Sequence, residues 1–337
     1  MRERIPGETR SKSMGNSGDR LHLSSKWMLR CYLVTVFSLS VLSLTACTRP
    51  NDASTASAIR SHILHMLPRS PQESQVVPLY LSNRRMLAIL RVGDSAPIPI
   101  VFDTGTSANL LDLKTAALLR LPRTGPSESV DGAGNPVPGY AMFVRNASLS
   151  GVPIPDGPAT AIDYNQTDEV GIFGPNSFPG RLVRLEGPEN RLSLLPVQPE
   201  TLPPCKPFQY LGTGDDGLPS ATLEIGELKI PAILDTGNDS AIILPTEYIH
   251  QIPLESAPTR IGYVYTAAGK QPLFGGRLNG ILTIGSVRLD HPEIHFAKDG
   301  KPNIGFPILR ALTVLMDPTG HRDWILSSDG RNTCKDE

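Results

Sequence analysis

Two Asp-Thr-Gly tripeptides, at residues 103–105 and 235–237, are the parts of this sequence best suited to chemistry. Each one follows an apolar run, so each delivers a carboxylate at a turn that leaves a buried strand. Two carboxylates held side by side cannot both ionise and must share a proton. The ionised one can then act as a base toward a bound water while the protonated one polarises a carbonyl group. Asp103 and Asp235 are therefore predicted to carry out water-mediated attack on a carbonyl.

An internal repeat supports the pairing of these two tripeptides. Five short segments recur in the same order, with offsets between 131 and 135 residues. The matched segments are 91–93 with 224–226, 98–105 with 230–237, 132–135 with 267–270, 149–152 with 283–286, and 172–174 with 303–305. Such a repeat predicts two homologous lobes, which we place at residues 75–200 and 201–337. Pseudo-twofold packing of the lobes would bring Asp103 and Asp235 together at their interface.

The elements that must position these residues are predicted to be β-strands. Short apolar runs bounded by Gly, Pro, Asn or Asp occur at 86–92, 98–102, 221–225 and 278–284. This spacing is typical of antiparallel barrels and sandwiches, and helical periodicity is confined to residues 113–121 and 246–252. No strand–helix–strand alternation appears, which argues against a dinucleotide-binding fold. The predicted fold class is all-β, with two β-barrel-like lobes and a cleft between them.

The chain from about residue 75 to residue 330 resembles the pepsin and retropepsin family of aspartic proteases. Each lobe of that family has an apolar run ending in Asp-Thr-Gly, a glycine-bearing hairpin called the flap, and a later apolar-apolar-Gly motif behind the catalytic turn. That motif corresponds here to residues 172–174 and 304–305, and residues 305–310 and 314–317 resemble the family's C-terminal pattern. The resemblance implies a monomeric aspartic endopeptidase of the acid-protease fold that cleaves peptides or proteins between its lobes, without a cofactor or metal.

The resemblance also assigns supporting roles to the residues that directly follow the two aspartates. Thr104 and Thr236 are expected to hold the two turns together by hydrogen bonds between the lobes. Gly105 and Gly237 are expected to allow a close approach of the backbone to the carboxylates, since glycine has no Cβ. Both repeats therefore supply a complete half of the expected site.

Two positions beside the aspartates depart from the family's pattern. Thr106 has a hydroxyl that can hydrogen-bond the outer oxygen of Asp103, but the equivalent residue of the second repeat is Asn238, an amide where pepsins have a hydroxyl. An amide can still donate a hydrogen bond. Asp239 adds a third carboxylate near Asp235, and we interpret it as an exposed turn residue.

The flap also differs from that of the pepsins. Pepsin-like enzymes carry a tyrosine in the first-lobe flap, whereas residues 131–136 contain none and Tyr140 lies beyond them. Retropepsins have glycine-rich flaps, which leaves activity compatible with this segment. The flap candidates are Gly132, Gly134, Tyr265 and Gly269.

The N-terminus has the features of a secretion signal. The first 46 residues carry seven Lys or Arg and three Asp or Glu, and they include a long uncharged run. Residues 44–47, Leu-Thr-Ala-Cys, resemble the lipobox of bacterial lipoproteins, whose cysteine is lipidated after cleavage. We predict a signal segment at residues 1–46, with Met28 as a possible true start, lipidation of Cys47 and a tether at residues 47–74. An uncleaved N-terminal anchor is the alternative.

Both interpretations place the rest of the chain outside the cytoplasm. The lipidated form would be attached to a membrane of the bacterial cell envelope and face the periplasm, and Thr48 after the lipidated cysteine favours the outer membrane. In that oxidising space Cys205 and Cys334 form one disulfide or remain two free thiols.

Composition excludes several other classes of protein. The 337 residues include 30 Gly and 32 Pro, with 19% charged residues, which argues against disordered, collagen-like and coiled-coil chains. A net charge of −1 gives no basis for nucleic-acid binding. The histidines lack the spacing of a metal site. Because of the flap and the Asn238 departure, a catalytically inactive peptide-binding or scaffolding lipoprotein of the same fold is the alternative function.

Overall fold

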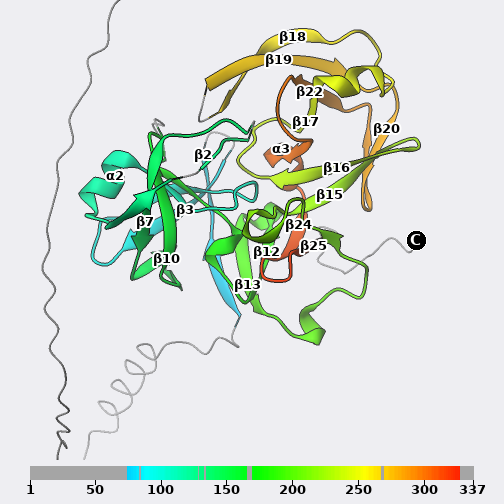
Figure 1. Ribbon diagram of the computed structural model, residues 1–337. Coiled ribbons are helices and arrows are strands. Elements are labelled where there is room, and N and C mark those ends of the chain that lie inside the picture. The colour runs from blue at the N-terminus through cyan, green and yellow to red at the C-terminus, as the bar shows by residue number, and fades with distance from the viewer. Residues whose placement is uncertain are drawn as a thin grey trace, which may run out of the picture. The chain divides into compact units, whose positions relative to one another are not determined.

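The computed structural model describes residues 74–82, 85–127, 129–132, 134–164, 169–266 and 269–326, all within one compact unit, Leu67–Glu337 (Figure 1). Most of these residues lie in β-strands, which confirms the predicted all-β fold. The predicted signal segment, the lipidation residue Cys47 and nearly all of the predicted tether lie outside the described residues. Within the described residues, no helix is both long and apolar enough to cross a lipid bilayer.

Ten strands form the first sheet, which we call the N-terminal sheet. Its strands are β2 (Tyr80–Ser82), β3 (Arg85–Val92), β4 (Ile98–Phe102), β5 (Leu110–Asp112), β6 (Arg123–Pro126), β7 (Gly139–Val144), β8 (Ala147–Leu149), β9 (Val152–Ile154), β10 (Gly157–Ile162) and β11 (Gly171–Phe173). Their order is β6-β7-β10-β5-β11-β4-β3-β8-β9, with β2 paired to β3. Met86, Ala88 and Leu90 of β3 are fully buried, because alternate side chains of a strand point to the same face.

Nine strands form the second sheet, the C-terminal sheet. They are β15 (Ser220–Ile225), β16 (Leu228–Asp235), β17 (Ile242–Pro245), β18 (Thr259–Thr266), β19 (Gly269–Arg277), β20 (Ile281–Ile284), β21 (Val287–Asp290), β22 (Glu293–Ala297) and β23 (Asn303–Gly305). Their order, β18-β19-β22-β17-β23-β16-β15-β20-β21, repeats the order of the N-terminal sheet position by position. In both sheets the strand that leads to an Asp-Thr-Gly turn pairs in parallel with a short later strand, β4 with β11 and β16 with β23. Figure 1 shows β18 and β19 as a long hairpin at the edge of this sheet.

A third sheet combines strands from both halves of the chain. It contains β1 (Gln75–Pro78), β12 (Arg181–Glu186), β13 (Arg191–Pro196), β14 (Phe208–Gln209), β24 (Thr313–Asp317) and β25 (Arg322–Leu326). Its order is β1-β13-β12-β24-β25-β14, so each half contributes three consecutive strands. The halves join where β12 pairs antiparallel with β24, in the register Leu185 to Val314. Backbone hydrogen bonds of this sheet therefore tie the two halves together.

In the part of the chain that the structure describes, helices are few and short. They are α2 (Leu113–Leu118), α3 (Phe306–Leu309) and the 3-10 helices η1 (Pro175–Ser177), η2 (Gly187–Glu189), η3 (Pro199–Thr201), η4 (Gly214–Asp216) and η5 (Thr246–His250). Helix α2 begins after Asp112, whose carboxylate accepts hydrogen bonds from the backbone N–H groups of Lys114 and Thr115. The helical segment expected at residues 113–121 is thus shorter than predicted, and the one expected at 246–252 is a 3-10 helix.

One continuous hydrophobic core contains residues of all three sheets. Among its largest fully buried side chains are Phe102, Phe173, Phe296 and Phe306. Phe102 directly precedes the first Asp-Thr-Gly turn, and Phe306 follows the short strand β23. Burial of a side chain of this size stabilises the fold by about 1.5–3 kcal/mol. The same packing that stabilises the protein therefore holds the segments around both turns.

Cys205 lies next to the third sheet, where its carbonyl accepts a hydrogen bond from Trp324 Nε1 at 3.0 Å. It takes part in a disulfide. Its predicted partner, Cys334, lies outside the described residues, so the pairing of these two cysteines stays a prediction.

Candidate active site

Each Asp-Thr-Gly turn begins at the end of a buried strand. Strand β4 ends at Phe102, and the Asp103 backbone N–H donates to the Phe173 carbonyl at 3.0 Å. Strand β16 ends at Asp235, which lies beside Gly305 of β23 in the parallel register. Both carboxylates are thereby presented at the same point of their respective sheets. Asp103 is only 9% exposed, so its side chain has little access to solvent.

The two turns are joined by four hydrogen bonds. Two of them connect the buried residues Thr104 and Thr236 with each other, and two connect their hydroxyls with carbonyl groups of the opposite strand. Thr104 N donates to Thr236 Oγ1 at 3.0 Å, and Thr236 N donates to Thr104 Oγ1 at 3.1 Å. The Thr104 hydroxyl donates to the Leu234 carbonyl at 2.6 Å, and the Thr236 hydroxyl donates to the Phe102 carbonyl at 2.8 Å. Each bond has a counterpart in the other repeat, so the arrangement has local twofold symmetry.

The glycines of the two turns lie against the opposite carboxylates. A Cβ added at Gly105 would lie 2.5 Å from Cγ of Asp235, and one added at Gly237 would lie 2.7 Å from Cγ of Asp103. The Gly105 N–H donates to Asp103 Oδ1 at 2.7 Å, and the Gly237 N–H lies 2.9 Å from Asp235 Oδ1 and 3.2 Å from Asp103 Oδ1. Only glycine fits at these positions, because any side chain would displace a carboxylate.

Asp103 and Asp235 are close enough to influence each other's protonation. Burial raises the pKa of Asp103 well above its usual range, and the negative charge of Asp235 and a hydrogen bond with its side chain raise it further. The backbone N–H groups of Gly105 and Gly237 oppose this effect, because they stabilise the ionised form. A raised pKa on Asp103 favours its protonated form, and a protonated carboxyl beside a second carboxyl group can serve as an acid.

Residues 88–176 match the family model for aspartyl proteases. The matched segment includes Asp103 with its turn and the buried Gly174 after β11, and it ends before Asp235. No curated protein was found to match the chain. The match indicates a protease-type function for this all-β chain, and a hydrolase more generally.

Thr106 and Asn238 have partners other than the carboxylates. The Thr106 hydroxyl donates to the Ala108 carbonyl at 2.8 Å, because the chain turns back on itself here. Asn238 Nδ2 donates to Asn303 Oδ1 at 2.8 Å, and Asn238 Oδ1 accepts from the Ser240 N–H at 2.9 Å. The hydrogen bonds expected from these positions by resemblance to the aspartic proteases are therefore replaced by a turn in one repeat and by an amide contact in the other.

Asn303 is a site residue that the sequence reasoning missed. Its Nδ2 donates to Asp235 Oδ2 at 2.5 Å, and the residue is 9% exposed. The sequence held a signal for it, because the repeat aligns Asn303 with Ile172 of the first aspartyl protease-like half. A polar side chain that replaces an apolar one in a buried strand usually has a hydrogen-bonding role.

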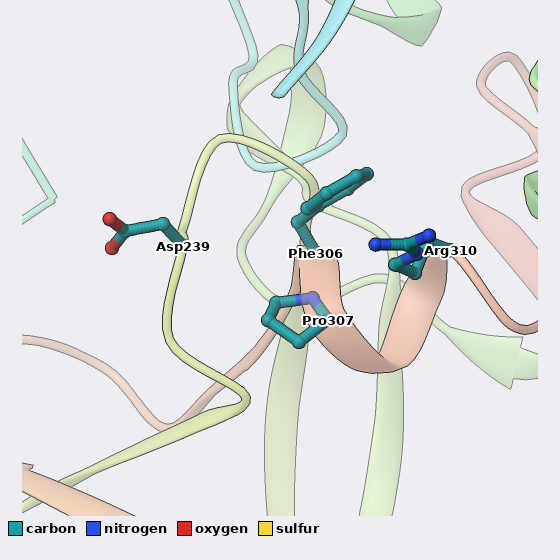
Figure 2. A pocket seen from close by; sticks show the side chains of 4 residues that line it. All are labelled: Asp239, Phe306, Pro307 and Arg310. Carbon is teal, nitrogen blue, oxygen red and sulfur yellow. The ribbon is translucent and has the colours of Figure 1, made fainter. Parts of the chain in front are cut away.

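Asp239 is exposed, as an ordinary turn residue would be. Together with Phe306, Pro307 and Arg310 it lines a shallow hollow of about 240 Å³. Figure 2 shows its carboxylate directed away from the Phe306 ring, while the Arg310 guanidinium lies on the other side of that ring. Within the described residues, no hydrogen bond connects Asp239 with the two site carboxylates.

The flap candidates lie at the tips of two hairpins. Gly132 and Gly134 are at the tip of the hairpin formed by β6 and β7, closed by a bridge between Val130 and Pro136. The Gly132 carbonyl oxygen lies 3.9 Å from where a Cβ of Gly300 would be, so this tip approaches the C-terminal half. Tyr265 lies on β18 and Gly269 begins β19, at the end of the second hairpin. Tyr265 is 73% exposed, so its ring does not cover the site in this structure.

A second polar group that the sequence reasoning missed lies near Asp103. Tyr164 is partly buried, and its burial raises the pKa of its hydroxyl, which the charges of Glu169 and Asp103 raise further. Arg85 is hydrogen-bonded to Tyr164 and forms an ion pair with the buried Glu169. Arg85 begins β3, and β3 runs antiparallel to β4, so this group lies toward the end of β4 from which Asp103 emerges. No sequence motif connects these residues, which come from segments about 80 residues apart.

Proposed function

We propose that this protein is an aspartic endopeptidase in which Asp103 and Asp235 together activate a water molecule. The observation that supports this most strongly is the reciprocal hydrogen bonding of Thr104 and Thr236, which holds two buried Asp-Thr-Gly turns face to face. The raised pKa of Asp103 supports the same proposal, because a pair that shares a proton supplies an acid and a base at once.

The proposed reaction needs only the two carboxyl groups and a water. The ionised carboxylate takes a proton from the water as the water oxygen bonds to the carbonyl carbon, and the protonated carboxyl gives its proton to the carbonyl oxygen. In the second step the former base returns a proton to the amide nitrogen, the former acid takes a proton from one hydroxyl, and the C–N bond breaks. The products are a carboxylic acid and an amine, and the pair again holds one proton.

The substrate class that fits this site is an extended peptide or protein segment bound between two lobes, residues 75–200 and 201–337. The matched strand order of the N- and C-terminal sheets supports this division. We further propose a monomer that is attached through lipidated Cys47 to the bacterial cell envelope, preferably the outer membrane, and faces the periplasm. A disulfide between Cys205 and Cys334 would suit that compartment.

The test is cleavage of a peptide library at mildly acidic pH by the full chain, with and without pepstatin. Asp103→Asn and Asp235→Asn are each expected to lower the rate by at least ~10²–10⁴-fold, because each removes one of the two proton-transferring groups. Asp239→Asn is the matched control, since it removes an exposed carboxylate near the site, and it is expected to stay active. Undiminished cleavage by Asp235→Asn would overturn the two-aspartate mechanism. If the wild type binds peptides without cleaving them, the alternative function, a catalytically inactive peptide-binding protein, is favoured. The altered hydrogen-bond partners of Thr106 and Asn238 are the reason to consider that alternative.

A further inference from the structure

A chain of three hydrogen bonds ends on one of the two carboxylates. The Ser240 backbone N–H donates to Asn238 Oδ1 at 2.9 Å, and Asn238 Nδ2 donates to Asn303 Oδ1 at 2.8 Å. Asn303 Nδ2 then donates to Asp235 Oδ2 at 2.5 Å. All three links run through side-chain amides, and they connect the loop after the second Asp-Thr-Gly turn with strand β23.

The direction of this chain is fixed by its first member. A side-chain amide has one donor end and one acceptor end, whereas a backbone N–H can only donate. Because the Ser240 N–H must donate, the oxygen of Asn238 faces it and the NH₂ group of Asn238 faces Asn303. The oxygen of Asn303 is then occupied, and its NH₂ group is the end that faces Asp235. The backbone thus determines that Asp235 receives a donor.

Packing holds both amides in place. The Asn238 carbonyl accepts a hydrogen bond from the Phe306 N–H at 2.8 Å. Gly305 lies against this loop so closely that a Cβ there would overlap the Ser240 carbonyl oxygen and approach Asn238 Nδ2 to 2.9 Å. Asn303 itself lies in β23, paired on one side with β16 and on the other with β17. Rotation of the Asn238 amide would break its hydrogen bond with the Ser240 backbone N–H, and rotation of the Asn303 amide would break its bonds with Asn238 and Asp235.

Among the described residues of the first repeat, no side-chain amide donates to Asp103 in this way. Ile172 occupies the position of Asn303 in the repeat, on β11 beside Val101 of β4. Its hydrocarbon side chain cannot donate a hydrogen bond. Asp103 receives the N–H groups of Gly105 and Gly237 on Oδ1. The two halves of the site, symmetric in their threonines, are therefore asymmetric in the donors that reach the carboxylates.

The geometry points to Asn303, oriented by Asn238, as a positioning residue that keeps the negative charge of the singly protonated pair on Asp235 and leaves the proton on Asp103. A hydrogen bond donated to a carboxylate stabilises its ionised form, and bonds to charged acceptors are the stronger ones. This inference rests on the proposed function for its consequence: Asp235 is the base that activates water, and Asp103 is the acid that polarises the carbonyl.

Other titratable groups around the pair do not replace this asymmetry. His295 Nδ1 contacts the Ser240 hydroxyl at 2.9 Å, and its Nε2 lies 3.3 Å from Glu293. The chain of three hydrogen bonds, however, begins at the Ser240 backbone N–H and does not involve that hydroxyl. Tyr164, on the Asp103 side, has a raised pKa and stays neutral. Asp239 is exposed. The Gly105 N–H also donates to one carboxylate alone, Asp103, but the amide of Asn303 is the charge-neutral side chain that donates to Asp235 and not to Asp103.

The test is carboxyl-carbon NMR of the full chain labelled with ¹³C-aspartate, at a pH where the pair holds one proton. Asp103→Asn and Asp235→Asn assign the two signals by their disappearance. The expected result is a protonated signal for Asp103 and an ionised signal for Asp235. In Asn303→Leu, which keeps the size but removes the donor, both signals should move toward an intermediate position. Ile172→Leu is the matched control at the equivalent strand position and should leave both signals in place.

The inference is overturned if the wild type carries the proton on Asp235, or if folded Asn303→Leu shows the wild-type signals. Should Asn303→Leu fail to fold by circular dichroism, Asn238→Leu decides in its place, with a smaller shift in the same direction expected and an unchanged spectrum counting against the inference.

Kinetics supply an independent readout. In Asn303→Leu the acid limb of the kcat/KM profile, which reports protonation of the charged carboxylate of the pair, should move to higher pH by roughly one unit. The peptidase activity of Asn303→Leu should be reduced through a lower kcat more than through a higher KM, because the contacts with substrate are unchanged. A wild type that cleaves no peptide yet shows the expected NMR pattern would refute the proposed function and leave the asymmetry standing. An active wild type with the proton on Asp235 would refute the asymmetry and leave the proposed function standing.

Discussion

Thr104 and Thr236 accept each other's backbone N–H, although 132 residues separate them in the chain. Both residues are essentially buried, and each hydroxyl also donates to a carbonyl of the opposite strand. Every polar atom of the two side chains is thus used, as buried hydroxyls require. The two threonines therefore fix the position of one Asp-Thr-Gly turn relative to the other.

Removal of one threonine hydroxyl should destabilise the protein. Thr104→Val leaves the Leu234 carbonyl and the Thr236 N–H without their partners, and buried unsatisfied groups cost about 1–3 kcal/mol. The free energy of unfolding in urea is expected to fall by this amount. Thr104→Ser, which keeps the hydroxyl, should lose clearly less. Thr104→Val and Thr236→Val each remove two different hydrogen bonds, but the two residues are in direct contact, so the cost of the double variant should differ from the sum of the single costs. Strict additivity would contradict the coupling.

Gly237 should tolerate no side chain. In Gly237→Ala the new methyl group would lie within 2.7 Å of Asp103 Cγ, so the carboxylate must move. Peptidase activity is expected to drop by about 10²-fold or more, as displacement of a reacting group by an ångström typically does. Gly262→Ala, in strand β18 where nothing lies within 4 Å, is the control and should keep its activity. Comparable rates for the two variants would argue against the close approach.

The alkaline side of the activity profile should report Asp103. Burial, and then the charge of Asp235, raise the pKa of Asp103, so this carboxyl keeps its proton to a higher pH than an ordinary aspartate would. As the pH rises through that raised pKa the proton is lost, and no acid remains to polarise the carbonyl. The kcat/KM for a peptide is expected to fall on this side. A rate that continues to climb above neutral pH would contradict the shared-proton pair.

Asp323 should make the stability of the protein depend on pH. It is fully buried, and burial raises its pKa well above the reference value of 3.8, opposed by a hydrogen bond from the Ser220 N–H. The native state therefore holds a proton that the unfolded state releases above pH 3.8. Stability is expected to decrease as the pH rises from that value through the raised pKa.

Asp323→Asn should lessen this decrease, because its side-chain oxygen can still accept the Ser220 N–H while the group no longer ionises. Thermal unfolding measured across pH 4–8 checks this, with Asp94→Asn as an exposed control. A pH profile of Asp323→Asn identical to that of the wild type would show that another group is responsible.

The sequence was most informative where the signal was local or repeated. Short apolar runs bounded by turn residues predicted the all-β fold. The two Asp-Thr-Gly strings, at matching positions of an internal repeat, predicted which turns lie together, because a turn motif carries its own backbone geometry. Asn303 could not be assigned in this way. Its partner Asn238 lies 65 residues away, and which polar atoms meet there depends on how β23 passes the second turn.

Thr106 shows the opposite difficulty. Its position three residues after Asp103 suggested a bond to the carboxylate, but the nearby Ala108 carbonyl is the acceptor it reaches. The spacing of residues in the sequence does not show which of two nearby acceptors, a turn carbonyl or the site carboxylate, a hydroxyl will bond. The helix predicted after Pro245 is another such case. A 3-10 helix of five residues, Thr246–His250, makes this connection, and it is shorter than the predicted segment 246–252.

The division of the site between distant parts of the chain has a consequence for biosynthesis. Asp103 is made 132 residues before Asp235, and strand β23, which pairs with β16 beside Asp235, follows later still. A polypeptide still on the ribosome therefore contains one aspartate without its counterpart. Under the proposed function, such an unfinished chain can hydrolyse nothing. The proposed activity therefore requires that the second Asp-Thr-Gly turn and the strand that pairs beside it have been synthesised and folded.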